Sequence, residues 1–354
     1  MNAYAAVNAT PLVAGTWVDG IVQAIKIAHT NTGPSTYAPD GLPQIPIYGL
    51  GLQPLQANEL LLNGTAILMH ATIAGVNSGN PIAVLMECFG GAQQVAPATA
   101  SQHAVQFGQV AGVVGSARNL VMNVATASAT ATLTADEIVV ETALGGLRYC
   151  LASFNKTINL ATTGAGGMDT GTAPVSGFVA LYAIYNPTSG ASALLATNAA
   201  TKQGNVYGGA NMPAGYTASA LVGVWPTNGS SQFIVGYQAD RAFYCVQATA
   251  LSTSTPQASL TSLTLTSTVP ANAKSVQGNI NPTATGSTAT QGIQVAASSS
   301  GIATQASQIT ATSANQLLSA YNLPIITAQT IYYVWTVAGG TPSNLTLSVT
   351  GYTI

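Results

Sequence analysis

The acidic side chains are the first place to look for chemistry, because hydrolysis of a glycan usually needs two carboxylates about 5 to 10 Å apart. Asp136, Glu137 and Glu141 lie together in the segment DEIVVET, where Glu137 and Glu141 fall on one face of the expected strand. Such carboxylates are more typical of a solvated strand edge than of a catalytic pair. Asp169, in GGMDTG, is expected to form a turn by hydrogen-bonding its own backbone.

The other reactive residues indicate no catalytic or metal site. The three histidines are too far apart in sequence for metal-ligand spacing, although copies of His103 would converge if its segment lay on a threefold axis. Cys88, Cys150 and Cys245 fit neither a disulfide framework nor a zinc spacing, so we expect buried thiols. The nucleophile motif G-x-S-x-G is absent. We therefore predict no catalytic residue, no metal and no cofactor, and the chain is not expected to be an enzyme.

The tyrosines suggest binding instead, because aromatic rings flanked by uncharged amides and hydroxyls suit the faces of sugars. The chain has 14 Tyr and 3 Trp against 6 Phe. Tyr244 lies near a turn, whereas Tyr333 and Trp335 are expected in a strand core. Adjacent Asp240 and Arg241 form either a local ion pair or a group that orients a sugar hydroxyl. Exposed tyrosines in small β domains also serve as trimer contacts. The candidate receptor-binding residues are Tyr207, Tyr216, Trp225, Tyr237 and Tyr321.

Charge is scarce throughout the chain. Charged residues make up 5% of it and the net charge is -2, whereas an average soluble protein has roughly 25% charged residues. Without a basic stripe, nucleic-acid binding is disfavoured. The longest apolar run, residues 178–185, is too short to cross a bilayer. We therefore expect no membrane insertion, and the N-terminal residues show no secretory signal.

The polar positions are taken by Ser, Thr, Asn, Gln and Gly, which favour strands and turns. The composition therefore predicts a mainly β fold, and residues 178–185, apolar on both faces, are expected to form a buried central strand. Natural sheets normally protect their edges with Lys and other charges. A sheet protein with so few charges must cover its edges with other chains or closed sheets, so we expect an obligate oligomer.

Hydrophobic patterning and turn residues divide the chain into several parts. Residues 1–41 have weak periodicity, with one short helix indicated around residues 17–29, and are interpreted as an N-terminal docking arm. Residues 42–96 are predicted to form a small β domain. Residues 119–256 are predicted to form a β-sandwich, and residues 257–354 a second, jelly-roll-like β-sandwich.

Residues 97–118 are predicted to form a short helix, because Pro97 suits a first helical turn and apolar residues then alternate at spacings of four and three. Glycines in this segment weaken a helix by about 1 kcal/mol each, so it needs partners to be stable. We interpret it as a trimerisation segment; the alternative is a connecting helix packed on its own domain. The predicted trimer-interface residues are Ala100, Ala104, Phe107, Ala111 and Val114.

Several segments resemble tail-fibre proteins. GGAQQVAPATASQHAVQFGQV, residues 90–110, closely resembles a segment of tail fibres from tailed bacteriophages and prophages. TADEIVVET, INLATTGAGGMDTG, FVALYAIYNPTSGASALLAT and NMPAGYTAS resemble a module of many phage tail-fibre and receptor-binding proteins. The closing LPIITAQTIYYVWTVAGGTPSNLTLSVTGYTI is similar to the last strands of that module. Together these segments cover most of residues 50–354.

The resemblance implies a homotrimeric, β-rich fibre of the virion tail, present in the host cytoplasm during assembly. Its N-terminal part would dock on other tail or baseplate proteins, and its distal end would contact a cell-surface glycan or outer-membrane receptor of the bacterial host. The function predicted from the sequence is therefore a non-enzymatic receptor-binding protein that mediates attachment. The alternative is a structural tail-tip or baseplate adaptor without receptor contact. A depolymerase is disfavoured by the scarcity of carboxylates.

Overall fold

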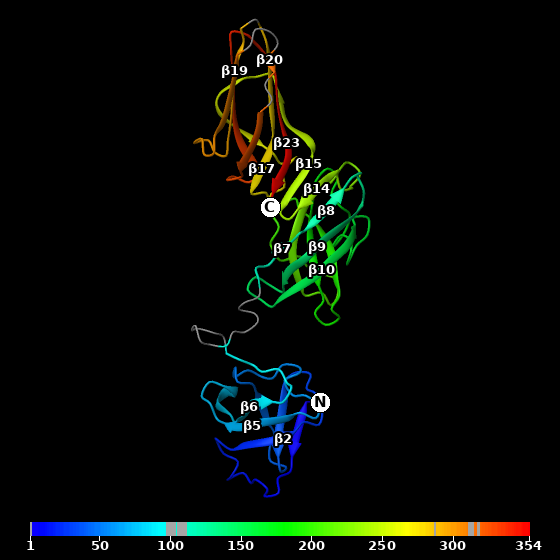
Figure 1. Cartoon of the computed structure of the whole chain (residues 1–354), viewed down its shortest axis with the longest axis vertical. Helices are drawn as coiled ribbons and strands as arrows, with labels where there is room; N and C mark the ends of the chain where they lie inside the picture. The colour runs from blue at the N-terminus through cyan, green and yellow to red at the C-terminus, as the bar shows by residue number, and fades with distance from the viewer. Residues whose placement is uncertain (1, 97–103, 105–111, 287, 311–314, 317–318) are drawn as a thin grey trace. The chain divides into compact units, whose positions relative to one another are not determined.

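The computed structural model describes residues 2–96, 104, 112–286, 288–310, 315–316 and 319–354. The prediction of a mainly β fold is confirmed, since regular structure in these residues consists of strands and one 3₁₀ turn at Asn77–Gly79. The chain divides into two compact units, Met1–Val110 and Ala111–Ile354, which are described separately (Figure 1).

The first unit contains one six-stranded sheet in the order β1-β3-β4-β6-β5-β2. Its side chains alternate between core and solvent, as in β3, where Ser35, Tyr37 and Pro39 are buried. This two-residue period gathers Tyr37, Ile47 and Leu68 into the core of the unit. The strands are β1 (Ala3–Ala6), β2 (Val22–Lys26), β3 (Ser35–Pro39), β4 (Ile45–Tyr48), β5 (Thr65–Ala71) and β6 (Ile82–Cys88).

Two predictions for the N-terminal residues are corrected. Residues 1–41 are not a separate arm, since β1, β2 and β3 belong to the same sheet as the strands of residues 42–96. The helix indicated around residues 17–29 is a turn followed by strand β2. Gln23, Ile25 and Ile27 are buried and alternate with exposed residues. Every second residue therefore faces the core, as in a strand, although the apolar residues also fit a helical spacing.

The first half of the second unit is built around β11, which pairs with β12 on one side and β13 on the other. All its residues except Tyr185 are buried, which confirms the predicted central strand. A loop over residues 199–217 covers one side of it, where Tyr182 packs edge-on against Tyr207. The strands are β7 (Ala117–Arg118), β8 (Val121–Val124), β9 (Thr130–Glu141), β10 (Arg148–Asn159), β11 (Phe178–Tyr185), β12 (Ser192–Asn198), β13 (Ala218–Pro226), β14 (Gly236–Ala239) and β15 (Ala242–Thr253).

The second half continues the same sheet. Strand β23 pairs with both β15 and β17, while β16, β22, β18 and β19 form a second sheet of four strands. The two halves, which were predicted as separate sandwiches, therefore share one 13-stranded sheet and one hydrophobic core. The remaining strands are β16 (Gln257–Thr264), β17 (Ser275–Thr285), β18 (Thr290–Ala296), β19 (Gln305–Thr310), β20 (Asn315–Gln316), β21 (Ser319–Pro324), β22 (Thr330–Ala338) and β23 (Thr341–Thr353).

The predicted helix over residues 97–118 is not found where the structure describes that segment. Residues 112–116 lie outside regular structure and Ala117–Arg118 form β7. Val114 is buried in the core of its own unit, so it is unavailable for a helical seam between chains, and Ala104 is exposed outside any regular element. The other predicted interface residues, Ala100, Phe107 and Ala111, and His103, lie outside the described residues.

The Asp40 carboxylate in the first unit predicts an acid dependence. It accepts hydrogen bonds from the side-chain amide and the backbone N–H of Asn8 and from the backbone N–H of Leu12, each at 2.7 Å, and these bonds lower its pKa below the ordinary 3.8. A carboxyl group whose pKa is lower in the folded than in the unfolded chain stabilises the fold at pH values above its unfolded pKa. This contribution is lost as the pH falls through its folded pKa.

We therefore expect Asp40→Asn to make the stability of the first unit less sensitive to pH over the acid range below about pH 4. The measurement is hydrogen exchange of the backbone amides in residues 8–12, followed over that range. Glu87→Gln is the control, since Glu87 is exposed on β6 of the same unit. Identical acid profiles for the wild type and Asp40→Asn would contradict the assignment.

Candidate functional site

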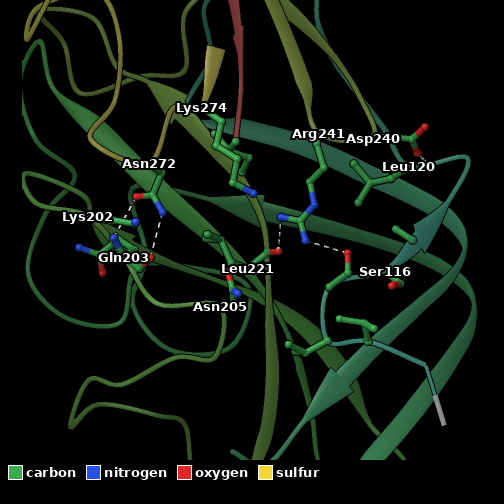
Figure 2. Close-up of a pocket in the computed structure, with 15 residues that line it drawn as sticks. Ser116, Leu120, Lys202, Gln203, Asn205, Leu221, Asp240, Arg241, Asn272 and Lys274 are labelled. Carbon is green, nitrogen blue, oxygen red and sulfur yellow. Dashed lines mark hydrogen bonds between the residues drawn. The ribbon is translucent and has the colours of Figure 1, made fainter. Parts of the chain in front are cut away.

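A cavity of about 600 Å³ lies within the second unit, where four connecting segments meet (Figure 2). Residues 113–117 precede and begin β7, the loop after β12 supplies Lys202, the turn between β14 and β15 supplies Arg241, and Lys274 precedes β17. Figure 2 shows the side chains of Arg241 and Lys274 extending into this cavity, with the loop that carries Lys202 on its other side. The four segments are far apart in the sequence and come together in the folded unit.

Arg241 is fixed by backbone carbonyls. Its Nη1 donates to the Leu221 oxygen at 2.9 Å and its Nη2 donates to the Gly115 oxygen at 2.8 Å. Gly115 has φ 74°, and a Cβ atom at this position would lie 2.3 Å from the Arg241 Nη2. Only glycine therefore allows the guanidinium to approach this closely. Burial of the guanidinium lowers the pKa of Arg241.

The predicted local ion pair between Asp240 and Arg241 is not formed. An oxygen of the Asp240 side chain instead accepts a hydrogen bond from the backbone N–H of Leu120 at 3.1 Å. Asp240 is the one carboxylate side chain among the residues that line the cavity. Over the part of the chain that the structure describes, none of Lys202, Arg241 and Lys274 lies within 4.0 Å of a carboxylate oxygen.

Two reciprocal hydrogen bonds hold the loops that carry the lysines. The backbone N–H of Gln203 donates to the Asn272 side-chain oxygen, and the Asn272 side-chain amide donates to the Gln203 carbonyl, each at 2.9 Å. Asn272 is buried. Next to this contact, the backbone N–H of Lys274 donates to the Thr353 carbonyl. The backbones of Lys202 and Lys274 are thus held close to each other, while both side chains are exposed.

A second candidate is a row of paired residues across neighbouring strands, which we call the tyrosine row. Tyr237 lies opposite Asn123 and Tyr244, Tyr244 opposite Gly351, and Gly351 opposite Gln277. Directly opposite residues of antiparallel strands point to the same face. Both tyrosines are 42% exposed. The Gln277 side-chain nitrogen would lie 3.2 Å from a Cβ atom at position 351, so this amide covers the glycine beside Tyr244.

The other candidate receptor-binding residues are less accessible, which corrects three of them. Trp225 is fully buried, with Phe233 and Phe243 packed against its ring. Tyr321 is buried in strand β21 and donates to the Ser348 carbonyl. Proximity to a turn in the sequence does not determine which face of the sheet a side chain takes. Tyr207 is also buried, and Tyr216 is half-buried.

The Asp169 carboxylate forms the expected turn and also a wider network. Its Oδ1 accepts from the backbone N–H of Thr170, while its Oδ2 accepts from the Tyr207 hydroxyl at 2.8 Å and the Thr197 hydroxyl at 3.0 Å. Burial, together with the bond to Asp169, raises the pKa of Tyr207 to about 12. Asp169 therefore joins the loop after β12 to that strand.

The carboxylates of DEIVVET do not form a pair facing solvent. Glu141, expected at a solvated edge, is buried and accepts a hydrogen bond from the Arg148 guanidinium. Glu137 is exposed and pairs with Arg118 at 3.7 Å, and Asp136 accepts from the Asn119 side chain. Each carboxylate thus has a separate structural partner.

The expectation of three buried thiols is correct for Cys88 alone. Cys150 is exposed and Cys245 is half-buried. Over the residues that the structure describes, His, Cys, Asp and Glu side chains do not gather in groups of three that could hold a metal ion. In the same residues, no helix has the length and hydropathy needed to cross a bilayer.

Comparison with known proteins gives no family for the chain. No protein-family model matches it, and no curated protein matches its sequence.

Burial predicts losses of stability of very different size when two of the candidate aromatic residues are replaced by alanine. We expect Trp225→Ala to lower the free energy of unfolding by about 3–5 kcal/mol, because it leaves a cavity against Phe233 and Phe243. Tyr237→Ala, on the exposed face of β14, is the matched comparison and should change stability by less than about 1 kcal/mol. Denaturant unfolding of the full chain measures both. Equal losses for the two variants would contradict the assigned burial.

Proposed function

We propose that this chain is a tail-fibre or receptor-binding protein of a tailed bacteriophage or prophage, without enzymatic activity, that attaches the particle to a bacterial surface. The observation that carries the proposal is the resemblance of several segments to tail-fibre modules over most of residues 50–354, in a chain with only 5% charged residues. The mainly β structure agrees with such a module.

The tyrosine row supports contact with a glycan. Sugars present apolar C–H faces and hydroxyls, which suit aromatic rings beside uncharged hydrogen-bonding groups. The row places the Tyr237 and Tyr244 rings between the amides of Asn123 and Gln277. Among the candidate receptor-binding residues, Tyr237 retains the exposure that this role needs.

The scarcity of charge supports a homotrimer. Exposed apolar side chains in the second unit include Val113, Leu144, Leu147, Val175 and Val246, each at least 65% exposed. Neither lysines nor carboxylates are numerous enough to protect the sheet edges of one chain from association. Contacts between identical chains would cover such surfaces.

The location and the oligomeric state can be tested together. We expect sedimentation of the purified chain to give about three times its mass of 35.5 kDa, as three-chain fibres require. In electron micrographs of particles labelled with an antibody against the chain, we expect the label on the tail. A monomeric mass, or label on the capsid shell alone, would refute the proposal.

The tyrosine row can be tested by binding to host cells. We expect Tyr237→Ala/Tyr244→Ala to weaken binding of the purified protein to cells that the phage infects by about tenfold or more, since two ring contacts are lost. Ile302→Ala/Ile326→Ala is the matched control, because it removes two exposed apolar side chains elsewhere in the same unit. Wild-type protein that neither binds cells nor blocks adsorption would favour the structural adaptor instead.

A further inference from the structure

The basic side chains of this protein are unevenly distributed. The whole chain has seven Lys and Arg residues, and three of them line the cavity described above. Elsewhere in the second unit, Arg118 and Arg148 pair with carboxylates. Within the described residues, the three cations of the cavity have no such partner.

Among the three cations of the cavity, Arg241 is partly buried and bound by backbone carbonyls. Removing a guanidinium from water is costly unless an opposite charge or hydrogen bonds compensate. The two backbone carbonyls satisfy part of that need, but they neutralise no charge. The close approach requires glycine at position 115. The fold therefore holds a partly buried positive charge at the wall of a cavity.

The two lysines add to this charge. The reciprocal bonds between Gln203 and Asn272 hold the backbone beside each lysine. Asp240 is the single carboxylate side chain among the described residues that line the cavity, so the side chains of the lining carry a net positive charge. A concave site with an excess of one sign of charge concentrates ions of the opposite sign.

We propose that this cavity binds an oxyanion carried by a sugar, a phosphate or a carboxylate group, with Lys202, Arg241 and Lys274 as its positive contacts. Its volume of about 600 Å³ is that of a small-molecule site. Ser116, Gln203 and Asn205 also line it and offer neutral groups to sugar hydroxyls. The anion site stands on the geometry, whereas the assignment of the sugar to the host surface rests on the proposed function.

The test measures binding of small anions to the full chain by isothermal titration calorimetry. The probes are inorganic phosphate, glucose 1-phosphate and galacturonate, with glucose as the neutral probe. We expect millimolar or tighter binding of at least one anionic sugar, weaker binding as salt rises, and weaker binding of glucose. Comparison of glucose 1-phosphate with galacturonate distinguishes phosphate from carboxylate.

The matched variants separate a site from general attraction. We expect Lys202→Gln/Lys274→Gln to weaken binding of the anionic sugar about tenfold or more, since two charged contacts are lost. Lys26→Gln/Lys156→Gln removes the same charge from β2 and β10, two strands that supply no residue to the lining of the cavity, and should change binding less than twofold. Equal effects of the two double variants, or no binding of any anion by the wild type, would overturn the site.

Cell binding keeps this inference separate from the proposed function. If the wild-type protein binds host cells but no anionic sugar, the anion site is refuted and the attachment role stands. If it binds the anionic sugar through the two lysines but neither binds cells nor reaches the tail, the site stands and the attachment role is refuted.

Discussion

Hydrogen bonds from uncharged side chains connect the loops of this protein, a role that ion pairs often have in other proteins. The rest of the structure depends on these bonds. Asn31 is fully buried, and its side chain donates to the carbonyls of Gly33 and Gln56 while accepting from the backbone of Glu59 and Leu60. Buried polar groups are generally paired in proteins, because an unpaired one costs about 1–3 kcal/mol. Amide side chains meet this requirement with a donor and an acceptor in one group.

The same constraint explains why the few charges stand out. Where amides and hydroxyls tie loops together, as Asn272 does with Gln203, lysines are not needed for that role. Charged groups then remain at positions where charge itself matters, such as Glu141 with Arg148 or Arg241 at the cavity. A surface with few charges would also suit the proposed contacts with sugars and with identical chains.

The sequence predicted the class of fold better than the site. The hydroxyl-rich composition predicted a mainly β fold, and the run that is apolar on both faces predicted the buried strand β11. Both predictions are confirmed. The burial of Trp225 depends on which face of β13 meets the core, which proximity to a turn does not reveal. Lys202 and Lys274 were missed because their closeness arises from a contact between distant loops. The one signal available in the sequence was that lysine is rare in this chain, which made each lysine a candidate for a specific role.

The pairing of β23 has a consequence for how the molecule is made. This strand lies between β15 and β17 and pairs with both, yet the ribosome adds it after either of them. Until it emerges, those two neighbours present open backbone to other nascent chains, which is the condition under which strands join wrongly. Formation of the second unit must therefore await the synthesis of β23, and it is expected to be slow because its contacts span distant residues.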